Sequence, residues 1–243
     1  MKKRYILISI LVLLSLFGLT LYIVRSVHRE PVFELHFFYL NRGRAIFLKT
    51  PQGKTVLIDG GQNSEVIREL TKLLPFYRRR IDYLIFTSAN AKNIGGLSEV
   101  VERYEVGKVY GPMLLGTSTA LFAFEKVLSK KSLYIERLEK GDEFEIDEVQ
   151  FEVLFPDLKY KYNKSSLPEL VLKIMFKDKT VLLLGDVSPT IQKSLIADVG
   201  RVDIVEFAHA AAKSRISPAL LGHITPRITV SSKREKTLKF EFR

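Results

Sequence analysis

The side chains best suited to metal chemistry are Asp186 and His209, each of which follows a predicted β-strand. A catalytic zinc ion takes about three protein ligands and a water molecule. Asp59, at the end of another predicted strand, is the available third carboxylate, and a loop between a strand and a helix adds only Ser88 and Asn90. Hydroxyl and amide oxygens suit Mg²⁺ or Ca²⁺ better than zinc. The chain therefore offers an incomplete metal site, and we expect no cofactor, with zinc or another divalent metal at Asp186 and His209 as the alternative.

Other catalytic arrangements are missing. The sequence has no Gly-x-Ser-x-Gly elbow. Ser214 lies near His209, but no set of partner residues for a serine nucleophile is recognisable around it. Gly95 and Gly96 are not followed by Lys-Ser or Lys-Thr, so they do not form a phosphate loop of the nucleotide-binding type. A structural role is the competing interpretation of Asp186, because the residues that follow it include Ser and Pro, which favour a helix start near 189.

Short apolar runs alternate with amphipathic stretches from residue 32 onward. Predicted strands cover 33–39, 45–49, 55–59, 83–87, 108–110, 134–137, 149–155, 170–176, 180–184, 203–207 and 227–230, and predicted helices cover 64–74, 98–104, 119–129, 189–196 and 218–222. Tight turns at 51–53 and 177–179 indicate antiparallel hairpins. Helices among strands must cover the outer faces of the sheets, which predicts an α/β sandwich in one large domain.

The loop at residues 87–97 reads Thr-Ser-Ala-Asn-Ala-Lys-Asn-Ile-Gly-Gly-Leu. It resembles the first metal motif of the metallo-β-lactamase fold, Thr-His-x-His-x-Asp-His-Ile-Gly-Gly-Leu. Other matches lie at 39–45, 56–61, 73–75, 80–85, 181–186 and 202–214, and together they cover roughly residues 32–230. The sequence is most similar to the metallo-β-lactamase-like domain of ComEC-type competence proteins, which carry DNA across the inner membrane. The resemblance implies an αββα sandwich of two mixed β-sheets with outer helices.

The departures from the family pattern are concentrated at the metal site. The degenerate metal-motif positions are Ser88, Asn90, Lys92, Asn93, Asp186 and His209, of which only the last two keep a ligand type. Tyr39 and Arg44 replace two family aspartates. Arg42, Arg44, Lys92 and Asp59 are the candidate ligand-binding residues, because cationic side chains would stand where divalent cations stood. We expect an ion pair between Lys92 and Asp186 to hold the emptied site together.

The sequence predicts two parts. Residues 1–29 form a basic tip, an apolar span and a short linker, and residues 30–243 form the folded domain. Residues 5–24 carry no charge and are long enough to cross a bilayer as a helix, which takes about 20 residues. A cleaved signal peptide is the competing interpretation. The three basic residues at 2–4 outnumber Arg25 and Arg29, which favours a single-pass protein of the inner (cytoplasmic) membrane with the folded domain on the extracytoplasmic side.

The net charge is +11, of which residues 1–29 contribute +5, so the folded part carries +6. Such an excess attracts phosphates of nucleic acid or lipid. Basic clusters lie at 78–80, 159–162 and 233–236, and the second alternates Lys with Tyr, whose ring stacks on bases. The competing interpretation of each cluster is an ordinary solvated surface.

Three functional hypotheses follow. The first is a membrane-anchored, non-catalytic relative of the DNA-uptake domain that binds DNA, another phosphate-bearing ligand or a partner of the uptake machinery. The second is a metal-dependent hydrolase, a phosphodiesterase or nuclease, with a rebuilt site. The third is a scaffold module of the cell envelope. ComEC-type proteins join this domain to a multi-helix channel, so a chain with one span requires a separate channel or envelope protein as its partner.

Overall fold

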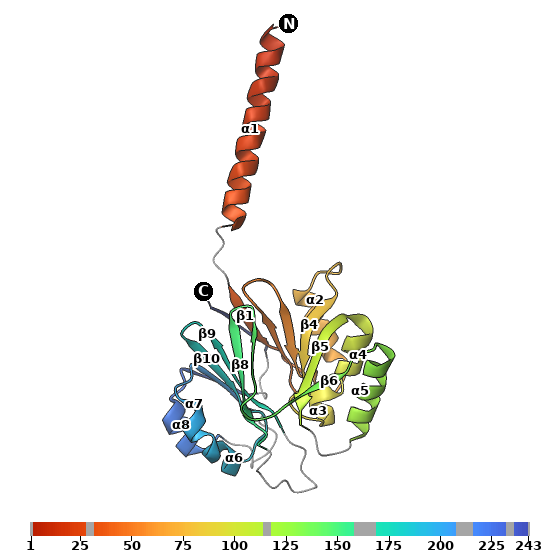
Figure 1. Cartoon of the computed structure of the whole chain (residues 1–243), viewed down its shortest axis with the longest axis vertical. Coiled ribbons are helices and arrows are strands. Elements are labelled where there is room, and N and C mark those ends of the chain that lie inside the picture. Colours follow the sequence, from red (N-terminus) through yellow and green to blue (C-terminus); the bar gives the residue numbers. More distant parts are fainter. Residues whose placement is uncertain are drawn as a thin grey trace. The chain divides into compact units, whose positions relative to one another are not determined.

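The computed structural model describes residues 2–27, 32–113, 118–157, 169–207, 216–231 and 236–242 (Figure 1). The chain divides into a first unit that ends at Val32 and a compact second unit, Phe33–Phe242. The first unit contains one helix, and the second contains every strand of the described residues.

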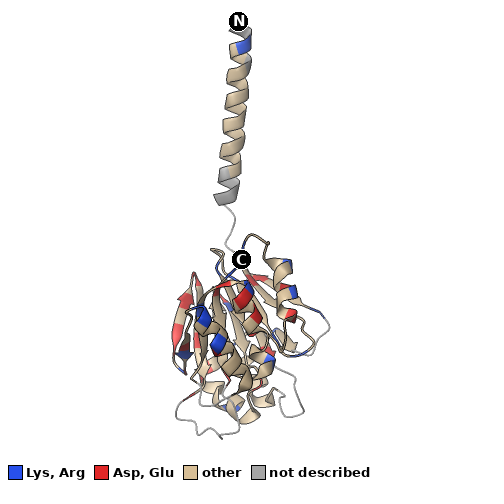
Figure 2. Cartoon of the chain, turned by 90° about the vertical axis from the view of Figure 1, so that its right-hand side faces the viewer, with Lys and Arg blue, Asp and Glu red and all other residues tan. Residues whose placement is uncertain are grey.

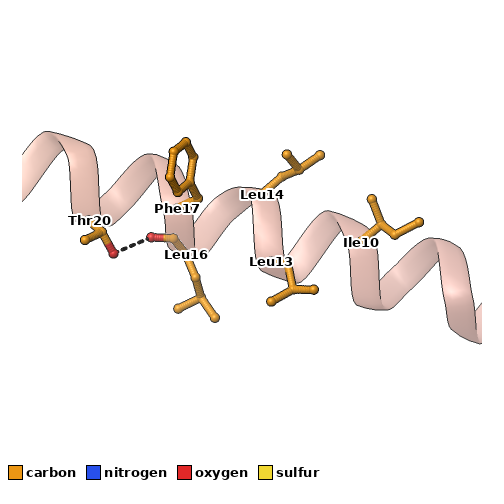
Figure 3. Close-up of a pocket in the computed structure, with 6 residues that line it drawn as sticks. All are labelled: Ile10, Leu13, Leu14, Leu16, Phe17 and Thr20. Atoms are coloured by element: carbon orange, nitrogen blue, oxygen red, sulfur yellow. Dashed lines mark hydrogen bonds between the residues drawn. The ribbon is translucent and has the colours of Figure 1, made fainter.

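Helix α1 (Lys2–Val27) is apolar over Arg4–Tyr22, a span of 19 residues with mean hydropathy 2.3. Figure 3 shows five apolar side chains and Thr20 projecting from it, and Figure 2 shows charge in its described part only near the N-terminus. The Thr20 hydroxyl donates to the Leu16 carbonyl at 2.8 Å, so its polar group is satisfied within the helix, as a hydrocarbon environment requires. By length and composition α1 can span a membrane, although a signal sequence passes the same test.

The second unit contains two mixed sheets. The first has the order β13-β1-β2-β3-β4-β5-β6, and the second has the order β12-β11-β10-β9-β8-β7. The first sheet consists of β1 (Phe33–Phe37), β2 (Ile46–Lys49), β3 (Thr55–Ile58), β4 (Arg80–Ile85), β5 (Glu105–Pro112), β6 (Ile135–Leu138) and β13 (Leu238–Phe242). The second consists of β7 (Glu143–Ile146), β8 (Val149–Phe155), β9 (Val171–Phe176), β10 (Lys179–Leu183), β11 (Ile204–Phe207) and β12 (Ile228–Ser231).

Helices cover the outer face of each sheet (Figure 1). The first sheet is covered by α2 (Glu65–Leu73), α3 (Ala91–Ile94), α4 (Leu97–Arg103) and α5 (Thr119–Lys130), and the second by α6 (Pro189–Ser194), α7 (Ile196–Val199) and α8 (Pro218–Ile224). One apolar core lies between the sheets and two others lie under the helices. Four layers with three cores confirm the predicted αββα sandwich.

Two strands and two short helices were not predicted from the sequence. They are β7, β13 and the single turns α3 and α7. Both strands lie at a sheet edge and are short and half-exposed, so their alternation of charged and apolar residues is a weak signal. Strand β13 pairs antiparallel with β1 and extends the first sheet by residues near the C-terminus.

The strand register defines the two sides of the first sheet along which its strands begin and end. These sides differ from the outermost strands, and each is named below as an edge. Ile46 pairs with Ile58, and Ile58 pairs with Ile85, so the end of β3, the end of β4 and the start of β2 meet at one edge, called the site edge. Phe33 begins β1 at the other edge, called the tether edge, because β1 and β2 are antiparallel. Loops at the site edge carry most of the residues that the sequence singled out.

Candidate functional site

The guanidinium of Arg44 is the centre of the candidate site. Its Nε donates to Oδ2 of Asp59 at 2.8 Å, and its Nη1 donates to Oε2 of Glu206 at 2.8 Å. Its Nη2 donates to the Thr87 hydroxyl at 2.7 Å and to Oε1 of Glu169 at 3.1 Å. The Arg44 side chain is 7% exposed, so this ion-pair network is buried. Every nitrogen of the guanidinium has an oxygen partner, which is the condition for burying such a charge.

The two sheets supply these partners from separate elements. Arg44 lies just before β2, while Asp59 and Thr87 follow β3 and β4 at the site edge. Glu206 is in β11 and Glu169 precedes β9, both in the second sheet. The backbone N–H of Leu170 donates to the Thr87 carbonyl at 2.7 Å, which brings the β9 loop against the first sheet. Arg44 therefore joins the ends of both sheets.

Asp59 is held in place by four donors. Its carboxylate accepts from the Thr87 backbone N–H at 2.7 Å, the Thr87 hydroxyl at 2.6 Å, Arg44 and Asn93 Nδ2 at 2.9 Å. Asp59 is fully buried and has a φ of 60°, a left-handed conformation that costs energy for a residue with a Cβ. The four hydrogen bonds offset that cost and fix the carboxylate toward Arg44.

Glycine backbones bring the loops of the site edge into contact. Gly43 has a φ of +87°, and a Cβ there would lie 1.9 Å from the Lys92 carbonyl oxygen. The Gly60 N–H donates to the Asn93 carbonyl at 2.6 Å, and the Gly61 N–H donates to the Arg44 carbonyl at 2.9 Å. Only glycine permits so close an approach. These glycines therefore hold Arg44 where it reaches the acids.

The charges in this cluster do not balance, because one guanidinium faces three carboxyl groups. Burial raises the pKa of Glu169 to about 8, against the opposing effect of Arg44. Burial by itself lowers the pKa of Arg44, but the negative charges of Glu206, Asp59 and Glu169 together raise it. Arg44 is thus a permanent cation, and Glu169 takes up a proton more readily than an exposed glutamate.

The remaining predicted residues lie around this network rather than in one cluster. Ser88 is buried and accepts from Asn90 Nδ2 at 3.1 Å, while Asn93 belongs to the Asp59 network. Arg42 and Lys92 are exposed. His209 lies outside the described residues.

Asp186 is exposed, and its backbone donates a hydrogen bond to Glu169. No ion pair between Asp186 and Lys92 occurs in the described part of the chain; the ion pair that holds the site together is made by Arg44 instead. The predicted cap of α6 is provided by Ser188, whose hydroxyl accepts from the Ile191 N–H.

The donor set of the described residues does not fit a metal. Within the described ranges, no group of three or more His, Asp or Glu side chains is arranged to hold one. The carboxylates of Asp59, Glu169 and Glu206 surround Arg44, whose positive charge takes the place that a cation would need. Ser88 and Asn90 add only neutral oxygens.

Sequence reasoning missed Glu169, Glu206 and Thr87 as members of the site. Glu206 carried a usable signal, since it is a single charge within an otherwise apolar strand, and such a residue requires a buried partner. Glu169 and Thr87 carried none, because neither stands out from its neighbours in the sequence.

Comparison with known proteins gave matches by structure. No family model matches the chain, and no curated protein sequence matches it. The metallo-β-lactamase fold protein YhfI from Bacillus subtilis is similar over 86% of this chain and 100% of its own, with a TM-score of 0.60 and 12% identity. Human tRNase Z, short form, is similar over 85% of this chain and 98% of its own, with a TM-score of 0.57 and 10% identity.

A third similar structure is CmlA, a diiron β-hydroxylase from Streptomyces venezuelae, with a TM-score of 0.53 and 16% identity over 82% of this chain. The chain spans 44% of that protein's length. At these identities the likeness concerns the fold alone. Together with the two facing mixed sheets and their outer helices, it shows that this chain has the metallo-β-lactamase fold.

Proposed function

We propose that this chain is a membrane-anchored, non-catalytic protein of the metallo-β-lactamase fold, and that it binds a ligand or partner instead of hydrolysing a substrate. One observation carries the proposal: the Arg44 guanidinium lies among Asp59, Glu169 and Glu206. It supplies the positive charge that keeps these acids together without a metal.

A guanidinium cannot replace the chemistry of a metal. Hydrolysis on a metal site uses a bound water whose pKa the ion lowers, and Arg44 has no open coordination position to hold one. Its raised pKa also prevents it from accepting a proton as a general base. The network therefore preserves the architecture of the site but provides no nucleophile.

Ligand binding is assigned to the exposed cations beside the network. Arg42 and Lys92 lie on adjacent loops, because Gly43 packs against the Lys92 backbone. Neither makes an ion pair with another described residue. Arg44 and Asp59 are left out of this role because both are buried, which changes the candidate ligand-binding set to Arg42 and Lys92. Two accessible cations at the site edge suit a phosphate-bearing ligand, and the ComEC resemblance favours DNA.

The partner and location follow from α1. We assign α1 as a single span of the cytoplasmic membrane with the folded domain outside, on the basis of its flanking basic residues. One span forms no DNA channel, so a role in DNA uptake needs a separate channel protein as partner.

Two measurements test the proposal. The first is metal content by elemental analysis of the chain and of Asp186→Ala after growth with zinc and manganese. We expect no bound metal in either. Near-stoichiometric metal that is lost in the variant would instead support a rebuilt hydrolase site at Asp186.

The second measurement is DNA affinity as a function of salt. Arg42→Ala and Lys92→Ala should each weaken binding and reduce the salt slope by about one unit. Lys126→Ala removes an exposed lysine from α5 and is the matched control, for which little change is expected. Absence of salt-dependent binding by the native chain would favour the envelope scaffold.

A further inference from the structure

Two aromatic side chains stand exposed in the turn between α2 and β4. Phe76 is 83% exposed and Tyr77 is 78% exposed, and their rings lie edge to face with centroids 5.5 Å apart. Arg78, Arg79 and Arg80 follow directly. Large apolar rings beside cations are unusual on a surface that contacts only water, and they are typical of contact with the interface of a bilayer. Residues 76–80 are called the aromatic-arginine turn.

The strand register places this turn at the tether edge. Phe33 begins β1, Glu34 pairs with Lys49, and Lys49 pairs with Thr55. The Thr55 hydroxyl donates to the Arg80 carbonyl at 3.2 Å, so the start of β4 is at the same edge as the start of β1. Three strand spacings separate β1 from β4, about 15 Å. Figure 1 shows the turn projecting beyond α2 at this end of the second unit.

The tether between the two units is short. Five residues, 28–32, join Val27 at the end of α1 to Phe33. A link of this length spans about 20 Å when fully extended. The start of β1 is therefore kept within about 20 Å of the end of α1 for any arrangement of the two units.

Two of the three arginines are available for an anionic partner. Arg80 bonds to Asp82 at 2.9 Å and also to Glu105. Arg78 donates to the Gly53 carbonyl at 2.6 Å, and within the described residues neither Arg78 nor Arg79 pairs with a carboxylate. Each cation near an anionic lipid surface is attracted to it, and a short tether makes this contact effectively intramolecular.

We propose that the aromatic-arginine turn rests on the surface of the bilayer that holds α1, with Phe76 and Tyr77 at the headgroup level and Arg78 and Arg79 against anionic lipid phosphates. The inference rests on the membrane anchor of the proposed function. Its consequence is an orientation: the site edge, with the Arg44 network, faces away from the membrane, because it lies at the opposite ends of the strands. A partner then reaches Arg42 and Lys92 from the aqueous side.

Tryptophan fluorescence tests the contact, since the native chain has no Trp. The full-length Phe76→Trp variant is placed in vesicles of anionic phosphatidylglycerol whose acyl chains carry bromine close to the headgroup. The matched control is Phe122→Trp, a side chain that is 72% exposed near the start of α5. The α5 cap, Ser118, donates to the Ala89 carbonyl at 2.7 Å, which places this control at the site edge.

We expect Trp emission in Phe76→Trp to shift to the blue and to be quenched by the brominated lipid, with no such change in Phe122→Trp. Arg79→Glu in the Phe76→Trp background should reduce the quenching. Equal quenching of both reporters in chains that float with the vesicles would overturn the inference and leave the anchor intact. Failure of the chain to float with vesicles would overturn the anchor and the inference together.

Discussion

Nη1 of Arg44 lies 2.8 Å from Oε2 of Glu206, although 162 positions separate the two residues in the chain. Arg44 precedes β2 in the first sheet, and Glu206 is in β11 of the second. Their contact joins the two halves of the sandwich at the site edge.

Arg44→Met should destabilise the folded domain by about 3–5 kcal/mol, because three buried carboxyl groups lose their only guanidinium partner. The measurement is the free energy of unfolding in urea, followed by circular dichroism. Arg42→Met, two positions away and exposed, is the control and should change stability by about 0.5 kcal/mol or less. Similar losses in both variants would show that the network is not what stabilises the site edge.

Arg44→Ala should create a weak cation site. Removal of the guanidinium leaves Asp59, Glu169 and Glu206 around an emptied space, and carboxylate oxygens are the ligands that Ca²⁺ and Mn²⁺ prefer. The measurement is the melting temperature with and without millimolar CaCl₂ or MnCl₂. The variant should be stabilised by the ion and the native chain should not. If the ion raised the melting temperature of the native chain more than that of the variant, the assignment of Arg44 as the resident cation would be contradicted.

Glu169→Gln should remove a loss of stability that develops as the pH rises from 4.5 to about 8. Burial raises the pKa of Glu169 from 4.5 to about 8, so the folded state binds more protons than the unfolded state between these values. Stability contributed by this group is therefore present below pH 4.5 and is lost as the pH rises toward 8, by up to a few kcal/mol. Urea unfolding at several pH values measures the slope. The Gln variant should show a flatter profile, whereas Glu102→Gln, at an exposed position, should keep the native one.

The stability lost by Gly43→Ala and by Gly53→Ala distinguishes the cost of backbone strain from the cost of a steric clash. Both glycines have nearly the same φ, +87° and +89°, so both substitutions carry a strain cost of about 1 kcal/mol. At Gly43 the new methyl group would also meet the Lys92 carbonyl at 1.9 Å, whereas at Gly53 the nearest atom is 3.7 Å away. We expect the first variant to lose clearly more stability in thermal unfolding. Equal losses would mean that the two loops separate at little cost.

Local sequence predicted most of the regular elements of this protein. Strand β8 has the predicted bounds, and α2, α4 and α5 lie within one or two residues of theirs, because each carries a strong periodic pattern or a capping residue. The edge strands β7 and β13 could not be found in this way. Their pairing depends on neighbours distant in the chain, as in the match of Phe33 with Phe242.

The sequence by itself determined the sandwich, the apolar N-terminal helix and a loop at 88–93 without His, Asp or Glu, because periodicity, an uncharged run and residue type are local properties. It also placed cationic residues in the loops of the site edge, but it paired the wrong one, since it gave Lys92 the role that Arg44 has. Only the tertiary structure decided this. A buried guanidinium is stable where acids converge on it, and here the acids come from loops and strands 15, 125 and 162 positions away.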